Sequence, residues 1–128
     1  MAANCRRKVW LNLLNNAADA IGQDGVIFVQ SRRNIRRQGI EISVADTGQG
    51  VDKKHLGKIF EPFFTTKQVG RGTGLGLSVS FGIIKDLGGN ISVLSPPPEE
   101  YLPGDFTGSE HHGPGTVFIV DLPMPRTK

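Results

Sequence analysis

Few residues in this sequence could crosslink or anchor the chain. Cys5 is the single cysteine among 128 residues, so an internal disulfide is excluded. No apolar run reaches the roughly 18 residues that a membrane-spanning helix needs, and no signal-peptide pattern opens the chain. We therefore expect residues 1–128 to form one soluble domain that works in the cytoplasm, although its parent protein could carry a membrane anchor.

Charge and aromatic content also narrow the possible partners. The formal net charge is +3, and much of the excess lies in Arg6–Lys8 and in a cluster between residues 32 and 37. Residues 30–39 contain no aromatic side chain on which a base could stack, so we expect no nucleic-acid partner and interpret the second cluster as a solvated hairpin loop. His111 and His112 are adjacent and lack the spacing of a metal-binding pair.

Hydrophobic periodicity predicts an alternation of helices and strands. Helices are expected at residues 6–21, 52–60 and 73–87, and strands at 25–31, 39–46, 90–95 and 115–123. The two long helices are expected to bury apolar faces, formed by Val9, Trp10, Leu13, Leu14, Ala17 and Ile21 and by Leu77, Val79, Phe81, Ile83 and Ile84. Residues 96–114, rich in Pro and Gly, are interpreted as a long surface loop. This order predicts an α+β fold: a mostly antiparallel sheet covered on one face by helices.

The polar face of helix 6–21 is unusual. It carries Asn12, Asn15, Asn16 and Asp19, although asparagine is a mediocre helix former and Lys, Glu or Gln would suit a solvated face better. One interpretation is a simple solvated face. The other is a wall of amide donors and neutral oxygen ligands, which suits a magnesium ion that it shares with nucleotide phosphates.

Two further stretches have more than one interpretation. In "DTGQG" (46–50), Asp46 ends a strand and could accept the exocyclic amino group of adenine, or it could form an ordinary Asp turn. In "GRGTGLGLS" (70–78), alternating glycines indicate a ligand close to the backbone. The glycine spacing fits neither the dinucleotide fingerprint nor the P-loop.

Taken in order, "NLLNNAADA" (12–20), "DTGQG" (46–50), "FEPFFTTK" (60–67), "GTGLGLS" (72–78) and "GTVFIVDLP" (115–123) resemble a known family. They are similar to the N, G1, F and G2 boxes and the last strand of the ATP-binding domain of bacterial sensor histidine kinases, within the superfamily of gyrase, Hsp90, histidine kinases and MutL. The short lid after "FEPFFTTK" is most similar to the nitrogen-regulator type. The resemblance implies a Bergerat-type, two-layer α/β sandwich with a mixed, mostly antiparallel sheet.

The resemblance also implies a site for ATP and Mg²⁺. Asn16 matches the family's magnesium ligand, Asn12 a position near the phosphates, Asp46 the residue that reads the adenine amino group and Thr116 a threonine that binds adenine through water. Asn12, Asn16 and Lys67 are the implied catalytic residues. The implied nucleotide-binding residues are Asn12, Asn16, Asp19, Asp46, Gly48, Gly50, Lys67, Arg71, Gly72, Gly74, Leu75, Gly76, Leu77 and Thr116.

Asn12 separates branches of this superfamily. Gyrase-type ATPases have a glutamate at the matching position that acts as general base on water, and an amide cannot take that proton. The expected function is therefore the positioning of Mg-ATP for transfer of the γ-phosphoryl group to a histidine on a separate dimerisation domain, which then serves a response regulator. The alternatives are a superfamily ATPase, an anti-sigma-type serine kinase, or a nucleotide-binding module that is inactive in isolation.

The chain departs from the family pattern in three respects. The first strand expected before helix 6–21 is missing, which would expose a sheet edge and invite self-association. No acceptor histidine is present, so we expect the chain to be inactive as a kinase when alone. Residues 96–114 form a longer connection than the family usually has.

Overall fold

The computed structural model describes residues 2–22, 25–36, 38–62, 64, 76–101 and 113–124. Its elements along the chain are α1 (Ala2–Ile21), β1 (Ile27–Asn34), β2 (Gly39–Asp46), α2 (Lys53–Leu56), α3 (Gly76–Asp86), β3 (Asn90–Leu94) and β4 (Thr116–Pro123). Each predicted element in these ranges is present. The ends differ most at α1, which begins at Ala2, and at the 52–60 helix, which is a single turn capped by the Asp52 carboxylate.

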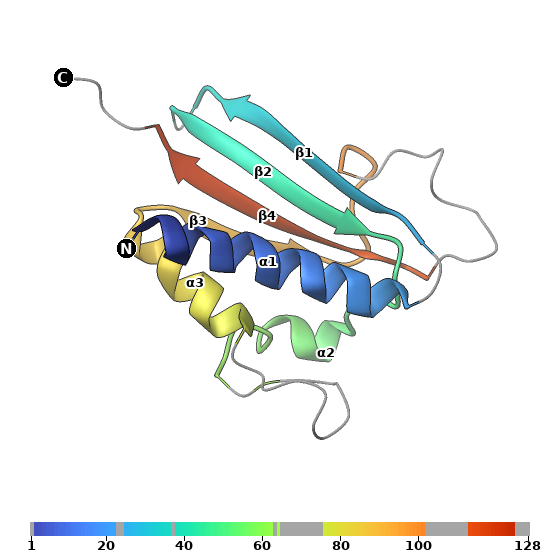
Figure 1. The fold of residues 1–128 in the computed structure, drawn as a ribbon. Helices are drawn as coiled ribbons and strands as arrows, with labels where there is room; N and C mark the ends of the chain where they lie inside the picture. The colour runs from blue at the N-terminus through green and yellow to red at the C-terminus, as the bar shows by residue number, and fades with distance from the viewer. Residues whose placement is uncertain are drawn as a thin grey trace.

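The four strands form one sheet in the order β1-β2-β4-β3. Each described pairing is antiparallel, so the α+β class is confirmed, and the parallel pairing of a mixed sheet does not occur among these strands. The register places Asp46 opposite Thr116 and Asn90 opposite Asp121. Helices α1, α2 and α3 lie on one face of the sheet, and α1 runs roughly along the direction of the strands (Figure 1).

The main core lies between this helical layer and the sheet. Alternate residues of each strand point to the same face. Val44, Phe118 and Val120 therefore meet Val9 and Leu13 of α1. The Phe60 ring packs against Phe81 at 5.4 Å and Phe118 at 6.2 Å between ring centroids, which joins the segment after α2 to α3 and β4. Burial of each large apolar side chain contributes roughly 1.5–3 kcal/mol.

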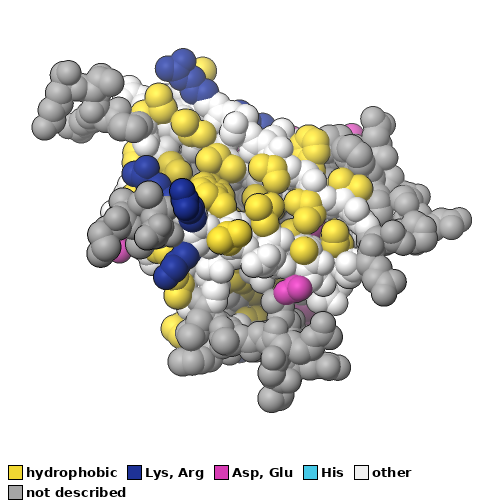
Figure 2. Space-filling model, viewed as in Figure 1, with side chains coloured by type: hydrophobic (Ala, Val, Ile, Leu, Met, Phe, Trp, Pro, Cys, Tyr) yellow, Lys and Arg dark blue, Asp and Glu magenta, His cyan; other side chains and the backbone are white. Residues whose placement is uncertain are grey.

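Two side chains predicted to be buried are exposed. Leu14 is 39% and Val79 is 43% accessible. The buried stripe of α1 follows Val9, Leu13 and Ala17, so it is narrower than the apolar face of the helical wheel. Together with Leu11 at 57%, these residues leave apolar surface on the helical layer. Figure 2 shows hydrophobic side chains gathered on this face, with Lys and Arg at the end where α1 begins.

The prediction that the basic cluster of residues 32–37 forms a hairpin loop is wrong for its first two arginines. Arg32 and Arg33 lie inside β1, opposite Glu41 and Ile40, and only the following residues form the turn. The Arg32 guanidinium bonds the Glu41 carboxylate at 2.7 Å and the Glu100 carboxylate at 3.0 Å. Cross-strand pairing of opposite charges explains why this charged stretch remains in the sheet.

The opposite face of the sheet is partly covered by the segment after β3. Tyr101, at the end of a turn over residues 99–101, packs against Ala45, Val117 and Ile119 (Figure 1, orange). Arg32 lies over the Tyr101 ring at 4.9 Å, so the ring is enclosed on two sides. The surface-loop interpretation of residues 96–114 is therefore wrong for Tyr101. Residues 102–112 lie outside the described residues.

Candidate functional site

The carboxylate of Asp46 is buried at the end of β2, with only 2% of the residue accessible. The backbone N–H of Gly48 donates to its Oδ1 at 2.9 Å, and the backbone of Thr116 also hydrogen-bonds the group. Burial raises the pKa of Asp46 from 3.8 to about 6, and these two hydrogen bonds lower it only in part. Such a carboxylate is a strong acceptor for a donor that arrives from a ligand.

The turn after Asp46 is fixed by neighbours on both sides. Thr47 accepts from the Val26 N–H through its Oγ1 at 2.9 Å and donates its own N–H to the Val26 carbonyl at 3.2 Å. Gly48 lies so close to Ala20 that a Cβ would come within 2.5 Å of the Ala20 carbonyl, and the Gln49 N–H donates to that carbonyl at 3.2 Å. A side chain at position 48 would therefore force the turn away from α1.

Gly50 and Thr116 close the other side of this turn. Gly50 has φ +77°, which favours glycine, and a Cβ there would lie 2.9 Å from Pro114 and 3.0 Å from the Ser95 hydroxyl. Thr116 is buried at the start of β4. The structure thus brings together Asp46, Gly48, Gly50 and Thr116, which the sequence assigned to the adenine end of the site.

A second polar group lies between α1 and the start of α3. The Asn12 amide nitrogen donates to the Gly76 carbonyl at 3.1 Å and to the Ser80 hydroxyl at 3.2 Å, and Ser80 donates to the Gly76 carbonyl at 2.9 Å. Asn12 is half-buried. Its amide orientation is set because the Gly76 carbonyl can only accept a hydrogen bond, and the Ser80 hydroxyl, which gives its proton to Gly76, is also left to accept one. These hydrogen bonds tie the Asn12 side chain to the first turn of α3.

The other residues predicted for the phosphate end of the site differ in burial, and some lie outside the described residues. Asn16, one turn after Asn12, is half-buried, and Asp19 is exposed; both already interact with other residues. The Leu77 side chain packs against the main core. The predicted residues that lie outside the described residues are Lys67, Arg71, Gly72, Gly74 and Leu75.

Helix α1 connects the two groups. Ala20 contacts the turn at Gly48, and Asn12 contacts the first residue of α3. Eight residues separate Ala20 from Asn12, which corresponds to roughly 12 Å along a helix. A base at the Asp46 end and a phosphate chain at the Gly76 end can therefore belong to one ligand that lies along α1.

The donor set at the Gly76 end suits a metal held mainly by a ligand. Among the described residues, no group of three His, Cys, Asp or Glu side chains could hold a metal ion. Asn16 offers a neutral amide oxygen instead. Mg²⁺ is commonly bound by one or two protein oxygens together with phosphates and water.

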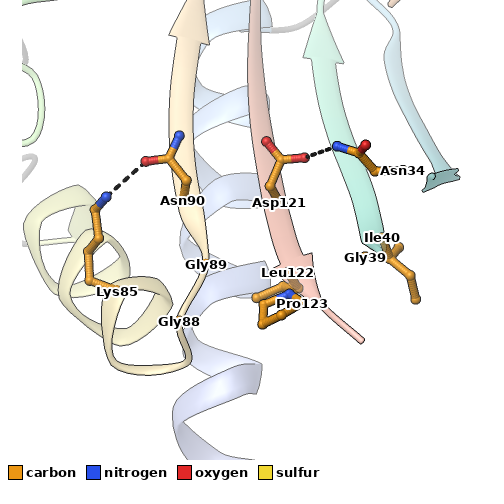
Figure 3. A pocket seen from close by; sticks show the side chains of 10 residues that line it. All are labelled: Asn34, Gly39, Ile40, Lys85, Gly88, Gly89, Asn90, Asp121, Leu122 and Pro123. Atoms are coloured by element: carbon orange, nitrogen blue, oxygen red, sulfur yellow. Dashed lines mark hydrogen bonds between the residues drawn. The ribbon is translucent and has the colours of Figure 1, made fainter. Parts of the chain in front are cut away.

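A separate polar pocket of about 470 Å³ lies at the other end of the sheet (Figure 3). There Lys85 donates to the Asn90 side chain at 2.9 Å, and Asn34 donates to Asp121 at 3.4 Å. The pocket reaches Gly39, at the opposite end of β2 from Asp46, or roughly 23 Å along the strand. It is therefore distinct from the group around Asp46.

Comparison with known proteins agrees with this geometry. The model of the family "Histidine kinase-, DNA gyrase B-, and HSP90-like ATPase" matches residues 6–126. The chain belongs to this family. Both polar groups lie within the matched range, so the ATP-binding fold predicted from the sequence motifs is confirmed.

Within the family, the chain is similar to histidine kinases. It is 40% identical over 121 residues to the sensor histidine kinase ZraS of Escherichia coli strain K12, a match that covers 94% of this chain and 22% of that protein. The solved catalytic domain of histidine kinase ThkA has a TM-score of 0.71 at 32% identity and covers 94% of this chain and 67% of that one. This chain is accordingly a catalytic domain of the histidine kinase type.

A solved full-length protein, ShkA, is also similar to this chain. ShkA, solved in complex with AMPPNP, has a TM-score of 0.70 at 28% identity over 96% of this chain and 22% of that one. The chain spans 12% of the length of the two-component sensor PprA of Pseudomonas aeruginosa, a relative 38% identical over 91% of this chain. In the part of the chain that the structure describes, no helix has the length and apolar character needed to cross a bilayer.

Sequence reasoning missed three polar residues of the site. Ser80 is buried on the inward side of α3, and the signal for it was a hydroxyl at an apolar position four residues after Gly76. Thr47 was treated only as part of a turn, although it is buried and ties the turn to Val26. Ser95 follows β3 directly and carried no recognisable signal.

Proposed function

We propose that this domain binds Mg-ATP along α1 and positions the γ-phosphoryl group for transfer to a histidine on a separate dimerisation domain. The observation that carries the proposal is the pairing of a buried carboxylate, in the turn region next to the C-terminal end of α1, with an oriented asparagine in the middle of that helix. The first position suits adenine, and the second suits phosphates.

At the adenine end, Asp46 accepts the exocyclic amino group of the base. Its buried position makes such a bond strong, because little water competes for the carboxylate. Gly48 and Gly50 let the turn beside Asp46 pack closely against Ala20 and Ser95, which a side chain at either position would prevent. Thr116, opposite Asp46 in the register, supplies a hydroxyl at the same point.

At the phosphate end, Asn16 supplies an oxygen to Mg²⁺, while Asn12 holds the start of α3 in place. Gly76 is the first residue of α3, so its N-terminal N–H groups and helix dipole favour the negative phosphates. The predicted roles of Lys67 and Arg71 at the two ends of a short lid remain part of this proposal. So do the roles in nucleotide binding predicted for Asp19, Gly72, Gly74, Leu75 and Leu77.

Asn12 also favours transfer over hydrolysis. Its amide nitrogen donates to both Gly76 and Ser80. A glutamate at this position has no proton to donate when it is ionised and would repel the Gly76 carbonyl. The local structure thus suits an amide, which cannot act as general base on water.

The proposed partner is the dimerisation and phosphoacceptor domain of the parent kinase, and a response regulator receives the phosphoryl group afterwards. Leu11, Leu14 and Val79 provide exposed apolar surface close to the phosphate end, where a helical partner could dock. Self-association through β1, an edge strand, is less favoured because Arg32 and Arg33 lie in that strand. The domain itself acts in the cytoplasm.

A reconstitution experiment tests this function. The chain is mixed with γ-labelled ATP, Mg²⁺ and the dimerisation domain of its parent protein, and the Asp46→Asn chain serves as control. Acid-labile label on a histidine of the dimerisation domain is expected in the mixture that contains the native chain, and not in the mixture that contains the Asp46→Asn chain. Steady phosphate release without protein label would favour the ATPase alternative, and acid-stable label on serine would favour the serine kinase.

A further inference from the structure

Ser95 is the first residue after β3 and lies behind the turn that follows Asp46. Its hydroxyl contacts three groups: the Gly115 carbonyl at 2.6 Å, the Val51 N–H at 2.9 Å and the Thr116 hydroxyl at 3.4 Å. These groups belong to the two segments that enclose the adenine end of the site. Ser95 is therefore a junction between the Gly48–Val51 turn and the start of β4.

The directions of these hydrogen bonds follow from the proton count. A serine hydroxyl has one proton and two lone pairs. The short contact to the Gly115 carbonyl, which can only accept, uses the proton. Ser95 must then accept from Val51 and from Thr116, so its hydrogen-bonding capacity is filled.

This arrangement orients Thr116. Because the Thr116 hydroxyl donates its proton to Ser95, it presents lone pairs to a ligand or to a bridging water. With Asp46 opposite, both polar side chains at this end are then acceptors. A base that offers an amino group matches Asp46, because that group donates to the carboxylate. Adenine has such a group, whereas hypoxanthine has a carbonyl at the same position, which a carboxylate repels. The turn that Ser95 holds through the Val51 N–H includes Gly48, whose N–H donates to Asp46.

We propose that Ser95 is a positioning residue for adenine selectivity, acting through the Gly48–Val51 turn whose Gly48 N–H holds the Asp46 carboxylate. The inference rests on the proposed nucleotide site. Ser95 does not itself touch the base in this account; it sets the positions of groups that do.

The variant Ser95→Ala tests the inference. It should weaken Mg-ATP binding about tenfold, because two oriented hydrogen bonds that shape the pocket are lost. Mg-ITP, in which hypoxanthine replaces adenine, should bind with little change. The readout is the ratio of ITP to ATP dissociation constants from calorimetric titration of the full chain, which should fall about tenfold in the variant.

Ser43→Ala is the matched control. Ser43 is equally part of the sheet, is 1% accessible, and its hydroxyl has no hydrogen-bond partner among the described residues. This variant should keep the native ratio. An equal loss of ATP and ITP binding in Ser95→Ala would show that Ser95 only supports the fold, and an unchanged ratio would also overturn the inference.

Asp46→Asn separates failure of this inference from failure of the proposed function. If Asp46→Asn abolishes the preference for ATP and Ser95→Ala does not, the nucleotide site stands and the Ser95 inference is wrong. If the native chain does not prefer ATP over ITP, the adenine assignment of Asp46 is wrong and the Ser95 inference fails with it.

Discussion

Asp46 is the residue at which binding and stability conflict. Its carboxylate is removed from water and receives two backbone hydrogen bonds, yet burial still raises its pKa to about 6. The folded chain therefore holds a charge at neutral pH in a place that disfavours it. A ligand donor would relieve this, so we attribute the unfavourable charge to nucleotide binding.

The Asp46→Asn variant should make the nucleotide-free chain more stable at pH 8. The folded-state pKa lies above the unfolded value of 3.8, so the folded chain binds the proton more tightly, and its stability falls as the pH rises from about 4 to about 6. Above pH 6 the full penalty applies. We expect a gain of about 1–3 kcal/mol at pH 8 and little at pH 4, measured as the difference in free energy of unfolding by denaturant.

Native and variant chains should be compared at both pH values, which cancels the titration of other groups. A variant that is less stable than the native chain at pH 8, or a stability difference that does not change with pH, would show that the buried charge of Asp46 does not destabilise the folded chain.

Among single residues, the sequence allowed prediction of those with backbone or charge signatures. Asp46, Gly48 and Gly50 lie together as expected because one strand end and its turn contain them. Thr116 lies on β4, and its place beside Asp46 was expected only from the resemblance to a known family. Ser95 could not be predicted, because its contacts to Gly115 and Val51 join segments 20 and 44 residues apart. Only the folded sheet places them side by side.

At the scale of elements, periodicity predicted each helix and strand within the described ranges. Errors arose where neighbours decided the outcome. The charged residues of β1 stay in the sheet because Glu41 lies opposite Arg32, and Leu14 and Val79 are exposed because no described element covers that side of α1 and α3. The covered outer face was missed because Tyr101 is a single aromatic residue in a Pro-rich stretch, without periodicity to mark it.

Tyr101 should stabilise the sheet from its outer face. Replacing it with Ala removes the ring from Ala45, Val117 and Ile119, so we expect a loss of roughly 3 kcal/mol and a melting temperature lower by roughly 10 °C. The selectivity for ATP should persist, because Asp46 and Thr116 are not altered.

Glu100→Ala is the control for this prediction. It removes an exposed ion pair to Arg32 next to the same ring, which contributes less than about 1 kcal/mol. Equal melting temperatures for the two variants would contradict the packing role of Tyr101.

At the scale of the whole molecule, the domain supplies the nucleotide-binding part of the function that we propose. The chain spans 22% of ZraS, and the phosphoacceptor that we propose belongs to a different domain. What the domain contributes is geometry: α1 sets the distance between the two ends of the site, and the sheet fixes Asp46 against Thr116.

The most direct test of a single nucleotide site along α1 is calorimetric titration of native, Asp46→Asn and Asn16→Ala chains with Mg-ATP and with adenosine. Asp46→Asn should weaken both ligands between about tenfold and a hundredfold, because both carry the amino group. Asn16→Ala should weaken Mg-ATP and leave adenosine unchanged. Native-like binding of Mg-ATP by the Asp46→Asn chain would contradict the account.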